Sequence, residues 1–358
     1  MTRSSNNLWL HCFAVFTAAA TLVLVGIGGL VTSHEAGMAV PDWPTTYGYN
    51  MFLFPPSYWV GGIFYEHTHR LFASLVGLLT TVLAVWLWLR ESRSWMRRLG
   101  VVAFFTVVLQ GVLGGLRVTL FKDQIGIFHA TLAQFFLVLV SAMALMTSRW
   151  WQAAQGNSQL LLPSKKLGYL LVAAIALVFL QLALGATMRH QHAGLAVPDF
   201  PLAHGKIWPS TDPASLDVFN RTRLGVRDHN PITAFQIYLH MAHRIGALLT
   251  LLTAGFFAWS VRRQLGAKAA VSRLSLAWLT LIFCQASLGA ATVLSKKAAD
   301  VATAHVVLGA LSLVMGALVC VVVFRFAFHR DVARAFVAKS EHLGDRAVSA
   351  AKRVPSTG

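Results

Sequence analysis

Charged side chains are scarce in this chain, and acidic ones are the fewest. Asp and Glu number 13 and Lys and Arg 30 among 358 residues, so charged residues make up only 12%. A soluble domain carries about a quarter charged residues, and this shortage disfavours a soluble globular protein. Hydrophobic residues reach 56% and the mean hydropathy is +0.61. These values favour an integral membrane protein.

Cysteine is also scarce, since Cys12, Cys284 and Cys320 are the only three. All of them fall inside apolar runs, which excludes a disulfide framework and a thiolate metal site. We interpret them as small apolar side chains of the helix interior. The first apolar run has no small-residue cleavage site after it. We therefore expect it to be retained as a first helix and not removed as a signal peptide.

Lys and Arg give the chain a net charge of +17, but they do not gather as a nucleic-acid-binding face would require. They stand in short stretches after every second apolar run, on the side that also holds the N-terminus. This is the positive-inside pattern of a membrane protein. It predicts cytoplasmic N- and C-termini, and we expect no nucleic-acid partner.

Eight apolar runs are long enough to cross a bilayer, which takes about 20 residues in a helix. They lie at about 9–32, 68–90, 99–119, 127–148, 167–188, 239–262, 272–294 and 302–325. We therefore predict an all-α, multi-pass integral membrane fold with eight transmembrane helices. The basic end after about 330 is expected to be a cytoplasmic tail, either amphipathic or disordered.

An internal repeat organises the chain. Residues 35–48 read EAGMAVPDWPTTYG and residues 192–205 read HAGLAVPDFPLAHG, and EHTHR at 66–70 matches HMAHR at 240–244. Because each half has an even number of helices, the halves enter the membrane from the same side as parallel repeats. We predict two four-helix bundles with a linker and a tail, at 1–150, 151–166 (cytoplasmic linker), 167–328 and 329–358 (basic tail).

A shorter pattern recurs at the outer ends of the third, fifth and seventh helices. Each has a glutamine followed four residues later by a glycine, in QGVLGG from Gln110, QLALGA from Gln181 and QASLGA from Gln285. Small residues let transmembrane helices approach closely. We interpret these glycines as packing positions.

Four histidines stand at repeat-related positions near the outer ends of the even-numbered helices: His69, His129, His243 and His305. A single histidine in an apolar helix is commonly a hydrogen-bonded structural residue, but ionisable groups inside membranes mark functional sites. Two imidazoles facing each other across a four-helix bundle are typical of bis-histidine haem ligation. Zinc is disfavoured, because no Cys or carboxylate completes a tetrahedral set beside each pair.

Two arginines directly follow histidines of this set, Arg70 after His69 and Arg244 after His243. At the aqueous end of a helix they are candidates to pair with haem propionates through charge-assisted hydrogen bonds. The alternative is a cation that extends to the membrane surface. Arg117 and Arg189, at the outer ends of the third and fifth helices, are further candidates of the same kind.

The two halves differ at one position beside the histidines. Glu66 lies three residues before His69 and faces the same way on a helix, whereas its counterpart in the second half is His240. A buried carboxylate can act as a general acid or base. The sequence therefore predicts proton chemistry at the first pair only, although a carboxylate favoured by the helix dipole would explain Glu66 as well.

These residues resemble those of the haem A synthase family, the bacterial and mitochondrial membrane enzymes that convert haem O to haem A for terminal oxidases. The resemblance covers nearly the whole chain to about 325. It rests on AGMAVPDWPTTYG, Glu66-x-x-His69-Arg70, His129, His243-Arg244, His305 and the duplicated eight-helix plan. It implies an iron-binding oxidoreductase of heme A biosynthesis that oxidises a porphyrin methyl group to a formyl group by successive hydroxylations.

The resemblance also implies a role for each half. It places the substrate haem O at His69 and His129, with Glu66 essential to the chemistry, and haem b as cofactor at His243 and His305. The implied location is the bacterial cytoplasmic (inner) membrane. Candidate partners are membrane lipid, the haem O synthase farnesyltransferase, the terminal-oxidase assembly machinery and a second copy of the chain. Many bacterial members carry cysteine pairs in the outer loops, and this chain has none there.

Two other functions fit parts of the pattern. A di-haem membrane electron carrier would hold both haems permanently and turn over no substrate, but it needs no acid beside one ligand. A parallel-repeat transporter could use the histidines as a proton relay. The histidines lie near one surface and not at broken helices in the membrane midplane, which disfavours a transporter.

Overall fold

The computed structural model describes residues 7–153, 163–222 and 231–351, with side chains as far as Arg325. In these ranges the chain is helical apart from its connections, and eight helices are long and apolar enough to span a membrane, which confirms the predicted class. The helices are α1 (Leu8–Ser33), η1 (Met51–Leu53), η2 (Pro56–Tyr58), α2 (Gly61–Arg90), α3 (Ser94–Thr119), α4 (Asp123–Thr147), α5 (Arg149–Ala153), α6 (Lys165–His190), α7 (Pro213–Arg221), α8 (Ala234–Leu265), α9 (Ala270–Leu294) and α10 (Ala299–Ala351).

Three helices, α2, α3 and α8, begin at least five residues before their apolar runs, and α3 begins at Ser94, whereas 99 was predicted. Helix α2 begins at Gly61, whereas 68 was predicted, and α8 begins at Ala234, whereas 239 was predicted. Glycines and polar residues before the apolar runs lower the local hydropathy, but they do not prevent intrahelical hydrogen bonds. At α8 a capping box between Thr233 and Gln236 fixes the start, because each side chain satisfies a backbone N–H of the other residue. Glu66 therefore lies inside α2.

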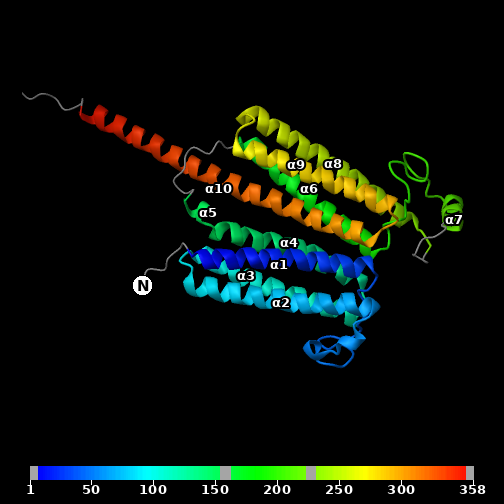
Figure 1. Cartoon of the computed structure of the whole chain (residues 1–358). Helices are drawn as coiled ribbons and strands as arrows, with labels where there is room; N and C mark the ends of the chain where they lie inside the picture. Colours follow the sequence, from blue (N-terminus) through cyan, green and yellow to red (C-terminus); the bar gives the residue numbers. More distant parts are fainter. Residues whose placement is uncertain (1–6, 154–162, 223–230, 352–358) are drawn as a thin grey trace, which may run out of the picture.

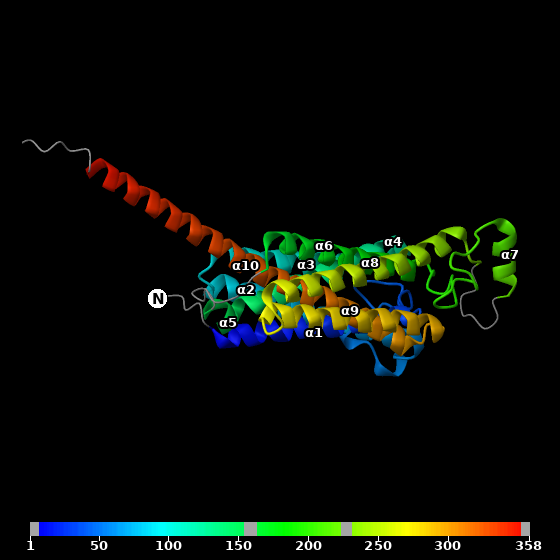
Figure 2. The same ribbon diagram turned by 90° about the horizontal axis from the view of Figure 1, so that it is seen from above.

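The membrane-spanning helices pack in two groups that lie side by side in Figure 1. Helices α1, α2, α3 and α4 contact one another, and so do α6, α8, α9 and α10. The groups meet where α1 and α4 contact α10 and where α4 contacts α6. The view from above in Figure 2 shows the long helices running roughly parallel.

Helices α4 and α10 are the most buried of the eight spans and therefore lie at the centre of the molecule. In α4, 56% of the most apolar stretch is buried and in α10 44%, whereas the other six spans have 17–33%. Large apolar side chains face outward instead, including Phe105 at 64% and Phe128 at 70% exposed. A soluble protein would not expose a surface of this kind, but lipid tails solvate it well.

Helix α10 runs without a break to Ala351. The predicted boundary between the second bundle and the basic tail, at 328/329, therefore lies within a continuous helix. Residues 352–358 of that tail and residues 154–162 of the predicted linker lie outside the described residues.

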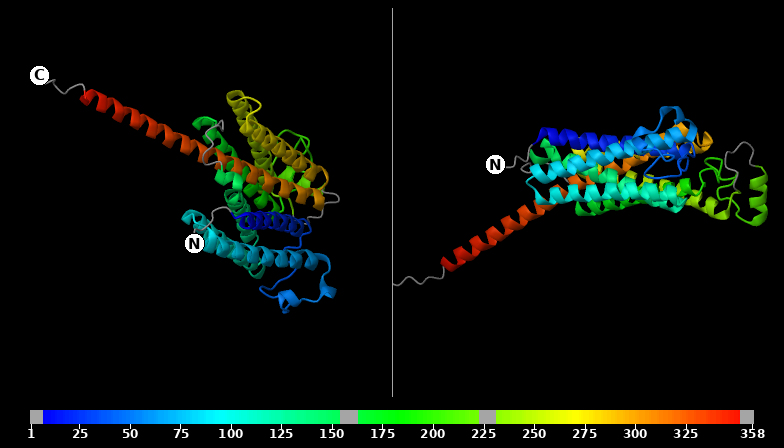
Figure 3. Two further views of the ribbon diagram at one scale, coloured as in Figure 1. Left: turned by 60° about the vertical axis from the view of Figure 1, so that its left-hand side comes forward. Right: turned by 90° about the horizontal axis from the view of Figure 1, so that it is seen from below.

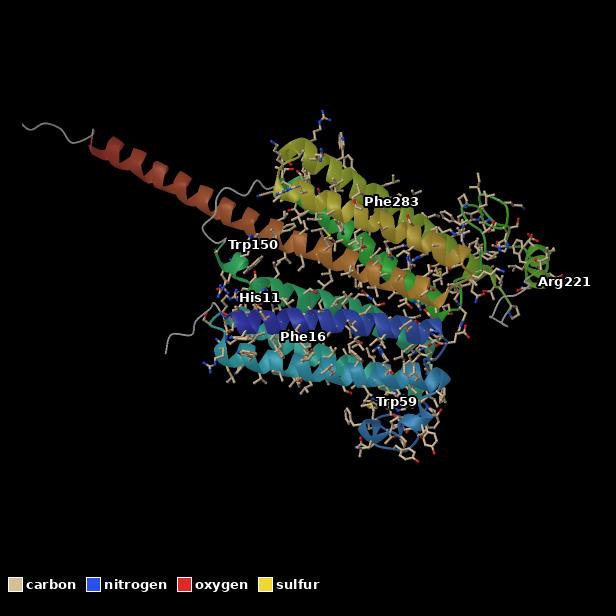
Figure 4. The ribbon with its side chains drawn as sticks, in the orientation of Figure 1. His11, Phe16, Trp59, Trp150, Arg221 and Phe283 are labelled. Carbon is tan, nitrogen blue, oxygen red and sulfur yellow. The ribbon has the colours of Figure 1, made fainter. Side chains whose placement is uncertain are left out.

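The molecule has two distinct ends. The long connections between α1 and α2 and between α6 and α8 lie at one, which we call the loop end (Figure 1). The beginning of α1 and the extension of α10 lie toward the opposite, terminal end (Figure 3). In Figure 4, Trp59 lies in the α1–α2 connection at the loop end, and His11 lies toward the terminal end.

Candidate functional site

The four histidines lie in matched places. His69 on α2, His129 on α4, His243 on α8 and His305 on α10 each fall in the second or third turn from the loop end of their helix. All four rings lie deep among protein atoms, yet each keeps part of its surface open. The four histidines are therefore only partly enclosed by the surrounding protein.

The second pair has the spacing of two ligands to one metal ion. The ring centroids of His243 and His305 are 6.5 Å apart, and the rings are inclined by 77°. Two imidazoles take up about this separation when a metal lies between them at about 2 Å from one nitrogen of each. His305 donates from Nδ1 to the main-chain oxygen of Gln285 at 3.0 Å. That bond leaves its Nε2 unprotonated and able to bind a metal.

Two glutamines of the recurring pattern contact histidines of this set. The side-chain amide of Gln181 donates to the main-chain oxygen of His243 at 2.7 Å and lies 3.1 Å from its Nδ1. Gln110 donates to the main-chain oxygen of His129 at 3.2 Å. The sequence pattern had indicated only glycine packing here, and the glutamines are site residues that the sequence reasoning missed.

The first pair differs in its polar contacts. His69 and His129 lie close enough to interact electrostatically. Neither ring has a hydrogen-bond partner for its buried Nδ1 atom within the described part of the chain. Histidines that hold a metal permanently almost always donate their second ring N–H to a partner. His305 has such an acceptor in the Gln285 carbonyl, whereas the Nδ1 of His243 has a side-chain amide nitrogen beside it and the Nδ1 atoms of the first pair have no partner.

A glycine lies against each of the four imidazoles. A methyl group on Gly28 would lie 3.1 Å from His69 Cε1, and one on Gly114 3.5 Å from His129 Cε1. The corresponding distances are 3.2 Å from Gly185 to His243 and 3.0 Å from Gly289 to His305. We call these four residues the seat glycines. Each one allows a ring to approach the neighbouring helix closely, as a planar cofactor between the paired rings would require.

Glu66 is buried, and both oxygens of its carboxylate accept hydrogen bonds. Its Oε1 accepts from Arg70 Nη2 and its Oε2 from the backbone N–H of Val40, both at 2.8 Å. The counterpart His240 is also buried, with its Nδ1 3.2 Å from the main-chain oxygen of Ala193. The carboxylate therefore joins α2 to the loop, and only the first half has such a group at this position.

Arg70 also binds the α1–α2 connection, through main-chain oxygens of that connection. Its guanidinium donates to the main-chain oxygens of Val40, Asp42 and Thr45 at 2.7–3.0 Å, besides Glu66. Arg244 likewise donates to the main-chain oxygens of Val197, Asp199 and Leu202. The predicted propionate contacts of Arg70 and Arg244 would compete with these carbonyl groups. The α1–α2 connection folds back over α2, and the sequence did not indicate this contact.

The aspartates of the repeated loops also make matched contacts. Asp42 accepts from the backbone N–H groups of Tyr47 and Gly48, and Asp199 accepts from those of His204 and Gly205. Burial works against ionisation of both, but the hydrogen bonds prevail and the pKa of each carboxyl lies below its usual value. These matched contacts support the proposed duplication.

Replacing Arg70 with alanine is expected to loosen the α1–α2 connection. Three carbonyl oxygens and the Glu66 carboxylate would lose a charged donor, at a cost of about 2 kcal/mol or more. Limited proteolysis with mass spectrometry should then show faster cleavage between 35 and 60. Arg90→Ala, at the other end of the same helix, serves as the control. Equal protection of the loop in both variants would contradict this anchoring role.

The donor set around the histidines suits haem better than a bare metal ion. Among the described side chains, no group of three or more His, Cys, Asp or Glu residues is placed to hold an ion. Two imidazoles per pair suffice for a haem iron, whose remaining four ligands come from the porphyrin. The ring spacing of the second pair and the four seat glycines fit such a group.

Fold and site together define a multi-pass membrane protein with two pairs of histidines near the loop end of its helices. Comparison with known proteins identifies the family. Residues 11–318 match the COX15-CtaA model, described as cytochrome oxidase assembly protein. The chain belongs to this family, which confirms the resemblance seen in the sequence.

Relatives named heme A synthase align over most of the chain. The protein of Shouchella clausii is 29% identical over 294 residues, covering 81% of this chain and 88% of its own length. That of Lysinibacillus sphaericus is 25% identical over 87% of this chain and 94% of its own length. That of Shewanella oneidensis is 25% identical over 81% and 89%.

Proposed function

We propose that this protein is a haem A synthase, an oxidoreductase that converts a methyl group of haem O into a formyl group by successive hydroxylations. Family membership supports the reaction, and one asymmetry of the site supports the assignment of the halves. The first pair has a buried carboxylate, Glu66, and unpartnered Nδ1 atoms. The second pair has no carboxylate at the matching position, and both of its Nδ1 atoms have polar neighbours.

The first half is proposed to be the substrate site. His69 and His129 would hold the iron of haem O between them, and their rings without Nδ1 partners suit a ligand that must enter and leave. Glu66 would accept or release the proton when the substrate C–H group is oxidised. The loop that Glu66 and Arg70 anchor would separate this group from water at the membrane surface.

The second half is proposed to hold haem b as a resident cofactor, which His243 and His305 would bind. Bound there, haem supplies a one-electron redox centre. The chain contributes the Gln285 carbonyl, which orients His305, and the seat glycines Gly185 and Gly289. Arg244, which holds the loop above, would shield this site from solvent.

The proposed topology follows from the two ends of the molecule. The loop end would face the outside of the bacterial cytoplasmic membrane, with both termini, the 151–166 linker and the 329–358 tail in the cytoplasm. The two bundles would comprise residues 1–150 and 167–328. Haem O is too apolar to cross water freely, so direct transfer from the haem O synthase is a proposed partnership, as are oxidase assembly and self-association.

Pigment analysis tests the reaction. The chain is produced with a haem O source in a host that makes no haem A, and extracted haems are identified by mass. We expect haem A to appear together with protein-bound haem b. Two bound haems without any haem A would instead support the di-haem electron carrier, and a preparation without haem would support the transporter alternative.

A further inference from the structure

Arg117 is a buried cation that lacks a close partner. It lies in the last turn of α3, and its side chain is 16% exposed. Its Nε is buried without a hydrogen-bond partner, and its nearest carboxylate oxygen, on Asp123, is 3.9 Å away. Arg70, by contrast, makes four hydrogen bonds of 2.7–3.0 Å. A buried charge without hydrogen-bonded compensation is costly unless an anion is bound to it.

Its position relates Arg117 to the first histidine pair. Arg117 follows the seat glycine Gly114 by three residues, so it lies on the same face of α3 and about one turn closer to the loop end. It interacts electrostatically with both His69 and His129. A haem held by this pair would thus have Arg117 on the side of the membrane surface, toward which haem carboxylates are directed in a membrane.

A glycine of the α1–α2 connection, Gly37, leaves space for the guanidinium of Arg117. A methyl group on Gly37 would lie 2.6 and 2.7 Å from the Nη1 and Nη2 atoms of Arg117, so the side chain lies directly across this glycine. In the second half the matching glycine, Gly194, is covered by the alkyl chain of Lys297, with the nearest approach 3.3 Å. In each half one long cationic side chain therefore lies over the same loop glycine, although Arg117 belongs to α3 and Lys297 to the α9–α10 connection.

We propose that Arg117 binds a propionate carboxylate of the porphyrin at the first site, and that Arg70 serves the loop instead. The planar guanidinium forms two parallel hydrogen bonds with a carboxylate, which suits it to this group. This assignment rests on the proposed function, since it takes haem O as the ligand of the first pair.

The test compares two ligands that differ only in these carboxylates. Purified protein with its haem b in place is titrated with haem O and with haem O dimethyl ester, and binding is followed by difference absorbance. Wild type should prefer the free acid. Arg117→Gln should weaken haem O binding about 10- to 100-fold, the worth of one or two charged hydrogen bonds, and leave ester binding unchanged.

Two further variants make the result specific. Gly37→Ala keeps the charge but displaces the guanidinium, and it should weaken haem O binding in the same direction. Lys122→Gln removes an exposed cation from the same end and should change neither affinity. An unchanged haem b spectrum shows that each variant is folded.

The possible failures are distinguishable. If Arg117→Gln and Gly37→Ala keep the wild-type preference for the acid, this assignment is overturned and the proposed function stands. The same holds if both ligands weaken equally. If wild-type protein binds neither ligand, the proposed substrate site is wrong and the assignment of Arg117 fails with it.

Discussion

Glu66→Gln is expected to abolish haem A formation while the resident haem b remains bound. Glutamine has nearly the same shape and can still accept from the Val40 N–H or from Arg70, which Glu66 does at 2.8 Å. It cannot exchange a proton, and general acid–base catalysis contributes about 10²- to 10⁴-fold. Haem A per mole of protein should therefore fall by about 100-fold or more, measured on extracted pigments beside the haem b absorbance of the same sample.

The matched residue of the other half provides the control. His240→Gln removes a buried group at the equivalent position, and we expect haem A to form at a rate within a few-fold of wild type. Glu66→Asp keeps the carboxylate and should retain more activity than Glu66→Gln. If Glu66→Gln makes haem A as well as wild type does, Glu66 only anchors the loop and the proton role is refuted.

His305→Ala is expected to remove the resident haem. The ring is one of two imidazoles 6.5 Å apart, and its Nδ1–H bond to Gln285 fixes its orientation. Removing a residue that only orients a metal ligand lowers metal affinity about 10- to 100-fold. Removing a ligand itself should lower the affinity at least as much. The ratio of haem b to purified protein, from absorbance, should fall at least tenfold.

Two other histidine variants test whether the loss of the resident haem is specific to the second pair. His69→Ala should keep the resident haem and lose haem O binding. His11→Ala alters a histidine of α1 that contacts the Ala144 carbonyl at 3.0 Å, and it should keep both haems. If His305→Ala retains full haem while His69→Ala loses it, the substrate and cofactor halves are exchanged with respect to our proposal.

The sequence was sufficient to predict the eight spans, because crossing a bilayer demands length and apolar composition and both are local properties. It was less accurate at helix ends. Gly61 and Ala234 begin their helices several residues before the apolar runs, where hydropathy carries no signal, and at Ala234 a capping box fixes the start. For the basic end after about 330 the sequence allowed an amphipathic or a disordered segment, and α10 continues through it to Ala351.

The site was predictable in its histidines and less so in its supporting residues. His69, His129, His243 and His305 repeat in the sequence, so duplication revealed them. Contacts between segments that are distant in sequence produce no repeated pattern, so they could not be predicted in this way. The sequence indicated a propionate partner or a surface cation for Arg70, yet it binds carbonyl groups 25–30 residues earlier in the chain. The Gln-x-x-x-Gly pattern was the one available signal for Gln181, and it was assigned to packing alone.

The seat glycines have a consequence for how this protein would respond to mutational scanning. Alanine substitution normally exposes function by deleting atoms, but at Gly28, Gly114, Gly185 and Gly289 it adds a methyl group within 3.0–3.5 Å of an imidazole. Such variants would tilt the ring and weaken its bond to iron while the polypeptide stays intact. Natural substitutions at these four places should consequently be tolerated less than those of many larger residues around them.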